Sequence, residues 1–152
     1  MEFGILFTSH PNTEAEPYPH RDVHARVTRQ VVRADELGYN YAWVAEHHFS
    51  NEYGIMPDVF VYAAYLAALT KRIKIGTAVV TLPLANPLRV AENTAFVDIL
   101  SQGRFALGLG SGYRKYEFDV KIPDRDMTPA NFRTIARIDE LVSTLMSDRS
   151  SR

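Results

Sequence analysis

The sequence predicts an α/β protein built around a parallel sheet, and three observations support this prediction. Short, continuous apolar runs of the kind found in strands buried on both faces occur four times along the chain. Each run leads into a turn or loop and then into a segment whose apolar residues recur at helical spacing. Repeated strand, loop and helix units favour parallel strands joined by right-handed crossover connections.

The first unit spans roughly the first quarter of the chain. Residues 1–9 form an apolar run that ends at a His-Pro-Asn turn signal, which predicts a strand. From His20 onward, apolar residues recur at helical spacing with charged residues between them. Gly38 then ends the predicted helix as its C-terminal cap.

The second and third units follow the same pattern. Residues 39–45 are rich in aromatic and β-branched side chains and predict a strand, and residues 59–69 predict a helix that is apolar nearly all round. Residues 73–82 predict a third strand, interrupted at Gly76, and residues 88–100 predict the helix that follows it.

The fourth unit begins with a predicted strand over residues 104–109, which runs into a glycine-rich segment. Residues 115–128 are charged and contain prolines, which is typical of a loop. Residues 130–146 carry a single apolar stripe and predict an amphipathic helix.

Composition narrows the class of protein. The 152 residues are 46% hydrophobic and 23% charged, which is ordinary for a globular domain. Seventeen Lys and Arg residues against 18 Asp and Glu residues give a net charge of −1, so no basic surface for nucleic acid or anionic membrane is expected. The absence of cysteine excludes disulfides and thiolate chemistry and fits a reducing compartment. Without a targeting segment or a run of ~20 apolar residues, a cytoplasmic protein is expected.

Three unusual groups of residues fall at the carboxyl ends of predicted strands, where parallel α/β proteins bind their ligands. The first strand ends in Thr-Ser-His at residues 8–10, and the second ends in Glu-His-His-Phe at residues 46–49. The fourth ends in Gly-Leu-Gly-Ser-Gly-Tyr at residues 108–113. This coincidence predicts an active site at that edge of the sheet.

Two interpretations remain open for the histidine pair. His47 and His48 are adjacent, so at most one of them faces the site unless the chain turns there. A histidine can act as a general base or as a hydrogen-bond donor near neutral pH, but it can equally hold a loop in place. The pair lacks the helical spacing of a zinc motif, so no metal site is predicted.

The glycines also leave two interpretations open. Gly108, Gly110 and Gly112 permit a ligand such as a phosphate to approach the backbone closely, but they could instead form a tight exit from a strand. The small residues 76–78 indicate a close neighbour, and simple close packing is favoured over a flat ligand.

Three stretches of the chain resemble the bacterial luciferase-like flavin monooxygenase family: AWVAEHHFSNEYG, KRIKIGTAVVTLPLANPLRVAEN and DILSQGRFALGLGSGYRKYEF. The resemblance runs from residue 1 to about residue 118. The EHHF, GTAV, NPLRVAE, LSxGRF and GxGxGY blocks all occur with the family's spacing.

The resemblance implies a parallel (β/α) barrel of TIM type, of which this chain supplies the first four strand–helix units. It also implies a monooxygenase that uses reduced FMN, often supplied by a separate flavin reductase, and O2. The implied substrate is an aldehyde, an alkane or a similar organic molecule. One branch of the family uses the deazaflavin F420, but the tandem histidine is more similar to the FMN branch.

The resemblance also assigns roles to residues. His47, the first histidine of EHHF, takes the role of the catalytic histidine. Ala78 and Val79 correspond to a non-prolyl cis peptide beneath the flavin ring, and Gly110 and Ser111 lie where the flavin phosphate binds. Because luciferase often has arginine at the position of Ser111, this contact would be weaker and uncharged. Apolar walls that exclude water from the ring are expected from Phe7, Phe49 and Leu109.

Length then becomes informative, because a full barrel takes ~250 residues. We interpret residues 1–118 as the N-terminal half of the barrel and residues 119–152 as a divergent C-terminal loop and helix. Three hypotheses follow: an N-terminal fragment of a monooxygenase that bears half of the site, a non-catalytic half-barrel that binds flavin or has a structural role and self-associates, or a complete monooxygenase formed by pairing. A homo-oligomer is expected, with no nucleic-acid or membrane partner.

Overall fold

The computed structural model of the protein describes residues 1–50, 53–112 and 117. The chain divides into two compact units, Met1–Tyr113 and Arg114–Arg152. All the elements described below belong to the first unit, and the helix predicted over residues 130–146 lies outside the described residues.

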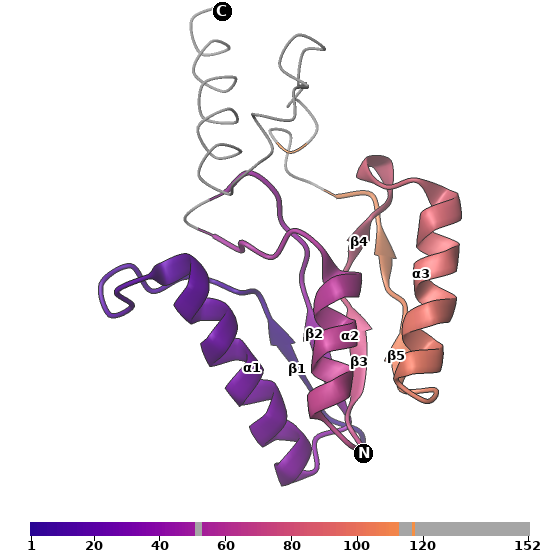
Figure 1. Ribbon diagram of the computed structural model, residues 1–152, viewed down its shortest axis with the longest axis horizontal. Helices are drawn as coiled ribbons and strands as arrows, with labels where there is room; N and C mark the ends of the chain where they lie inside the picture. The colour runs from indigo at the N-terminus through magenta and orange to yellow at the C-terminus, as the bar shows by residue number, and fades with distance from the viewer. Residues whose placement is uncertain (51–52, 113–116, 118–152) are drawn as a thin grey trace, which may run out of the picture. The chain divides into compact units, whose positions relative to one another are not determined.

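A parallel sheet is the centre of the first unit (Figure 1). Its strands lie in the order β1-β2-β3-β5 and all run parallel to one another. Their bounds are β1 (Gly4–Phe7), β2 (Tyr41–Val44), β3 (Lys74–Thr77) and β5 (Phe105–Ala106). A second, shorter parallel pair joins β4 (Val80–Thr81) to β6 (Leu109–Gly110), so that β3 and β5 each continue in a second short strand. The predicted parallel α/β order is therefore confirmed.

Three helices connect these strands: α1 (Pro19–Leu37), α2 (Val59–Leu69) and α3 (Pro87–Leu100), with a short 3-10 helix, η1 (Leu82–Leu84), before α3. Side-chain caps fix where α2 and α3 begin. The Asp58 carboxylate accepts hydrogen bonds from the first turn of α2, and the Asn86 amide oxygen does so for α3. At the end of α1, Gly38 adopts a left-handed φ of 86°, as the sequence predicted.

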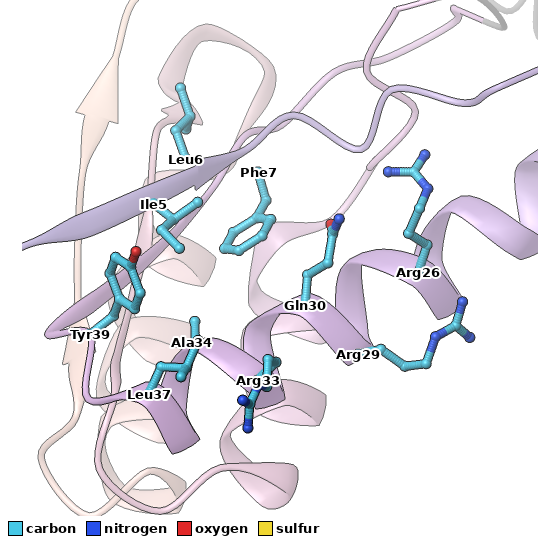
Figure 2. Close-up of a pocket in the computed structure, with 10 residues that line it drawn as sticks. All are labelled: Ile5, Leu6, Phe7, Arg26, Arg29, Gln30, Arg33, Ala34, Leu37 and Tyr39. Carbon is cyan, nitrogen blue, oxygen red and sulfur yellow. The ribbon is translucent and has the colours of Figure 1, made fainter.

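The hydrophobic core lies between the sheet and the helices. Alternate residues of β1 separate the two faces, because Ile5 and Phe7 point toward α1 whereas Leu6 points to the opposite side (Figure 2). Val44 and Ile75 continue the core across the sheet, and α1 and α2 contribute the buried valines, alanines and leucine that face them. No helix in the described part of the chain is long and apolar enough to span a membrane.

The predicted interruption of the third strand at Gly76 is wrong. Gly76 lies within β3, paired with Trp43 on one side and Ala106 on the other, and the break falls instead at Ala78 and Val79. A Cβ atom at Gly76 would collide with the Trp43 ring. The glycine is therefore required by close packing of the ring against the sheet, as the small-residue interpretation favoured.

Candidate functional site

The site begins at the carboxyl end of β2, where the chain turns after Ala45. His47 is buried, with 8% of its surface exposed. Its backbone N–H donates to the Met56 carbonyl at 2.9 Å, and its ring centroid lies 5.4 Å from that of Tyr53. Gly54 packs so closely against the imidazole that a Cβ atom there would overlap it. The segment of residues 53–56 therefore fixes the position of His47.

His48 faces a different neighbour. Its Nε2 atom lies 3.1 Å from Oε1 of Glu46, and the same oxygen accepts a hydrogen bond of 3.1 Å from the backbone N–H of Thr81. Glu46 therefore joins the end of β2 to β4. The two adjacent histidines point to different surroundings, as expected for consecutive residues at the end of a strand.

The end of β1 lies beside the same segment. The Ser9 carbonyl accepts a hydrogen bond of 3.3 Å from the Ile55 N–H, and the His10 ring lies edge-on to Tyr53 at 5.6 Å between centroids. Tyr53 thus contacts both His10 and His47. Tyr53 was not predicted as a site residue from the sequence, where its one local signal is the turn-forming glycine that follows it.

The break between β3 and β4 is adjacent to the end of β2. The peptide bond between Ala78 and Val79 is cis, and the Ala78 N–H donates to the Val44 carbonyl at 2.7 Å. Both side chains are only partly buried, so they present a small apolar surface. The cis peptide expected here is present, and a role for these residues in binding flavin remains a prediction.

The residues of the glycine-rich segment have different structural roles. Both backbone groups of Gly108 bond to the Thr77 hydroxyl, with its N–H donating at 2.8 Å and its carbonyl accepting at 2.9 Å. Gly108 therefore serves strand packing. Gly110 lies in β6 against the Val79 side chain, and Ser111 follows directly with an exposed side chain whose hydroxyl donates to the Gly112 carbonyl at 3.3 Å.

The structure thus places His47, the Ala78–Val79 bond and Gly110 at the carboxyl ends of neighbouring strands, with Ser111 next along the chain. One wall prediction is wrong. Phe7 lies in the core between β1 and α1. Side chains alternate between the two faces along a strand, and Phe7 is on the face that packs against the helices (Figure 2). Phe49 and Leu109 are exposed.

The fold and the site define a parallel α/β protein of the barrel type, with a buried histidine at the ends of its strands. Residues 1–142 match the family described as luciferase-like monooxygenase. The chain therefore belongs to the luciferase-like monooxygenase family, and the predicted partial TIM-type barrel is confirmed.

Individual relatives give the extent of this similarity. The alkanal monooxygenase alpha chain of Photorhabdus luminescens is 34% identical over 137 residues, which are 90% of this chain and 36% of that protein. The oxygenase component of the flavin-dependent trigonelline monooxygenase of Acinetobacter baylyi is 35% identical over 100 residues, 66% of this chain and 28% of that protein.

Among solved structures, the monooxygenase RslO1 from Streptomyces bottropensis superposes with a TM-score of 0.69 at 31% identity, over 95% of this chain and 42% of that one. The chain spans about a third of the length of the curated relatives that it matches.

Proposed function

We propose that this chain carries the N-terminal half of the site of a flavin-dependent monooxygenase, which uses reduced FMN and O2 to oxidise an aldehyde, an alkane or a similar organic substrate. The observation that best supports this proposal is that His47, Ala78–Val79 and Gly110, from three separate parts of the sequence, all lie at the same end of neighbouring strands. The flavin dependence of the trigonelline monooxygenase and the alkanal chemistry of the Photorhabdus enzyme support it as well.

The side chains at the candidate site have the chemical properties that FMN binding needs. The partly buried Ala78 and Val79 offer an apolar surface to a flat ring, and the exposed Ser111 hydroxyl offers a neutral donor to a phosphate. When bound, FMN would supply the electrons that activate O2. In this proposal the His47 imidazole gives or takes a proton at the reacting centre, in a position fixed by residues 53–56.

Replacement of His47 tests the proposal. In protein that turns over decanal with reduced FMN, we expect His47→Ala to lower turnover by roughly 10²- to 10⁴-fold, the usual contribution of a general acid or base. The dissociation constant of FMN, measured by fluorescence titration, should change little. His20→Ala, which alters an exposed histidine on α1, is the matched control. Full turnover in the His47 variant would contradict the assignment, and circular dichroism verifies that the variant is folded.

A second candidate is a non-catalytic half-barrel that binds flavin or has a structural role and self-associates. Within the described strands, β1 and β5 each pair along one side only. A groove of about 550 Å³ lies between β1 and α1 (Figure 2). Another of about 750 Å³ lies beside α3 and β5. Such edges favour association with a further strand. Light scattering during an FMN titration tests this candidate, and a monodisperse monomer that ignores FMN would overturn it.

Several finer statements belong to the same proposal. The trigonelline monooxygenase relative is the oxygenase component of its system, which supports a separate flavin reductase as a partner. A homo-oligomer and a cytoplasmic location are also proposed, the latter supported by a sequence without cysteine. The division into residues 1–118 and 119–152 remains our proposal for the domain organisation. An F420 titration run beside FMN distinguishes the two cofactors.

A further inference from the structure

Two buried serines of this chain differ in a way that burial alone does not explain. Ser9 and Ser101 are each 1% exposed. The Ser101 hydroxyl, at the end of α3, donates to the Asp98 carbonyl at 3.1 Å. The Ser9 hydroxyl oxygen has no hydrogen-bond partner among the residues that the structure describes. Because a buried hydroxyl without a partner loses its bonds to water and gains nothing in return, Ser9 destabilises the fold.

The backbone conformation of Ser9 is energetically unfavourable as well. Its φ of 50° lies in the left-handed region, which residues other than glycine seldom occupy. Such conformations persist where the surrounding structure enforces them, and they cluster at ligand-binding sites. Ser9 therefore combines two independent, unfavourable features in one residue.

The position of Ser9 connects it to the candidate site. Its carbonyl accepts the Ile55 N–H, and the next residue, Met56, accepts the His47 N–H. A single short segment thus links the end of β1 to His47. Since the strands lie in the order β1-β2-β3, Ser9 approaches the histidine from the side opposite to Ala78 and Val79.

We propose that the Ser9 hydroxyl is a ligand-binding group that is paired only when the site is filled, and that it donates its hydrogen bond to a carbonyl oxygen of the ligand. This inference rests on the proposed function, which supplies two such ligands: FMN, whose ring carries carbonyl groups, and an aldehyde substrate. Because the hydroxyl is buried in this structure, pairing requires the groups that cover it to move aside as the ligand enters.

The proposal predicts that stability and binding respond to Ser9→Ala in opposite directions. Removal of an unpaired buried hydroxyl should raise the melting temperature of the ligand-free protein. The same change should weaken the binding of one ligand by about 5- to 10-fold, the size of one lost hydrogen bond. Separate titrations with oxidised FMN and with decanal show which carbonyl Ser9 binds.

Two further variants serve as controls. Ser101→Ala removes a paired hydroxyl of equal burial, so it should lower the melting temperature and leave both titrations unchanged. Ser9→Gly also relieves the left-handed φ, and it should weaken binding as much as Ser9→Ala does, because both variants lack the hydroxyl.

The outcomes separate this inference from the proposed function. If wild-type protein binds FMN or decanal and Ser9→Ala binds both equally well, the inference is wrong and the proposed function stands. A lower melting temperature for Ser9→Ala, like that of Ser101→Ala, would equally overturn it, since the hydroxyl would then have a structural partner. If wild-type protein binds neither ligand, the proposed function fails and the inference fails with it.

Discussion

The two ends of the sheet differ in how their polar groups are satisfied. At the amino end, the Arg104 guanidinium donates to the carbonyls of Ala67, Thr70 and Ile73 and to the Thr70 hydroxyl, at 2.9–3.3 Å. Nearby, the Asp35 carboxylate accepts three backbone N–H groups at 2.7–2.9 Å. Each network closes the end of a helix onto the start of a strand.

The carboxyl end has a different character. Ser9 has a buried hydroxyl without a partner among the described residues, whereas left-handed backbone occurs at both ends, at Ser9 and Phe49 here and at Gln102 before β5. The Tyr53 ring lies against both the His10 and the His47 rings there. The comparison indicates that the amino end contributes stability, whereas the carboxyl end carries the unsatisfied group, as expected if the site we propose lies there, the arrangement of a TIM-type barrel.

The largest test of this comparison is Arg104→Met. The change leaves several carbonyls at the end of α2 without a donor, so we expect the free energy of unfolding to fall by about 4 kcal/mol. The urea midpoint measures the loss, and the affinity for FMN should be retained. Arg89→Met is the control, because the Arg89 side chain is 76% exposed in its pair with Glu92 and should matter little. A weaker FMN affinity in Arg104→Met without unfolding would break the division between the two ends.

Two glycines test the same comparison between the ends of the sheet, because Gly38 precedes β2 and Gly54 follows it. Gly38 and Gly54 both have left-handed φ values, 86° and 63°. A Cβ atom at Gly38 meets nothing within 4 Å, whereas one at Gly54 overlaps the His47 ring. Gly38→Ala should therefore cost about 1 kcal/mol from the backbone alone, and Gly54→Ala about 3 kcal/mol from backbone and overlap together.

The two alanine variants are read out by urea unfolding and by the NMR signals of the His47 imidazole. We expect these signals to shift in Gly54→Ala and to stay in place in Gly38→Ala. Equal losses of stability and an unmoved His47 would show that residues 53–56 do not fix the histidine.

The last test of the comparison concerns Asp35 and the pH dependence of stability. Burial by itself would raise the pKa of the Asp35 carboxyl, but its three backbone N–H donors and the nearby Arg72 outweigh burial and hold the pKa below its ordinary value. Asp35→Asn should therefore cost about 2 kcal/mol near neutral pH.

The sign of the pH dependence follows from the lowered pKa. The stability that Asp35 contributes is present above the pKa of the unfolded carboxyl, about 4, and is lost as the pH falls through the lower folded value. Urea midpoints of wild type and Asp35→Asn should differ by a constant amount between about pH 5 and 7, and they should begin to converge as the pH falls below about 4 and through the lower folded pKa. A difference that persists in acid would indicate that the carboxylate charge contributes nothing.

Much of the fold was predictable because its signals are local. Gly38, Asp58 and Asn86 mark helix ends through turn and capping chemistry that depends only on neighbouring residues. The strand break was misplaced because a glycine within a strand signals either a break or a close neighbour. Only the contact between Gly76 and the Trp43 ring decides between them.

The candidate site was predictable in part. The EHHF motif singled out His47, whose catalytic role remains a prediction, but nothing near it in sequence indicated that Tyr53 would contact both His47 and His10. Phe7 was assigned to the site because it is apolar and near a strand end. The alternation of side chains along β1 directs Phe7 into the core instead (Figure 2).

The sequence by itself determined the family, the order of the strands and helices, and the edge of the sheet where the candidate site residues lie. These follow from periodicity, turn residues and motif spacing, which are properties of short stretches of chain. Tertiary structure alone decided that the Thr77 hydroxyl hydrogen-bonds with both the N–H and the carbonyl of Gly108. It also decided that Glu46 joins β2 to β4, and that the Ser9 hydroxyl is buried without a partner among the described residues. Each of these depends on groups some 30 or more residues apart, or on the packing around one atom, and no local pattern records such a meeting.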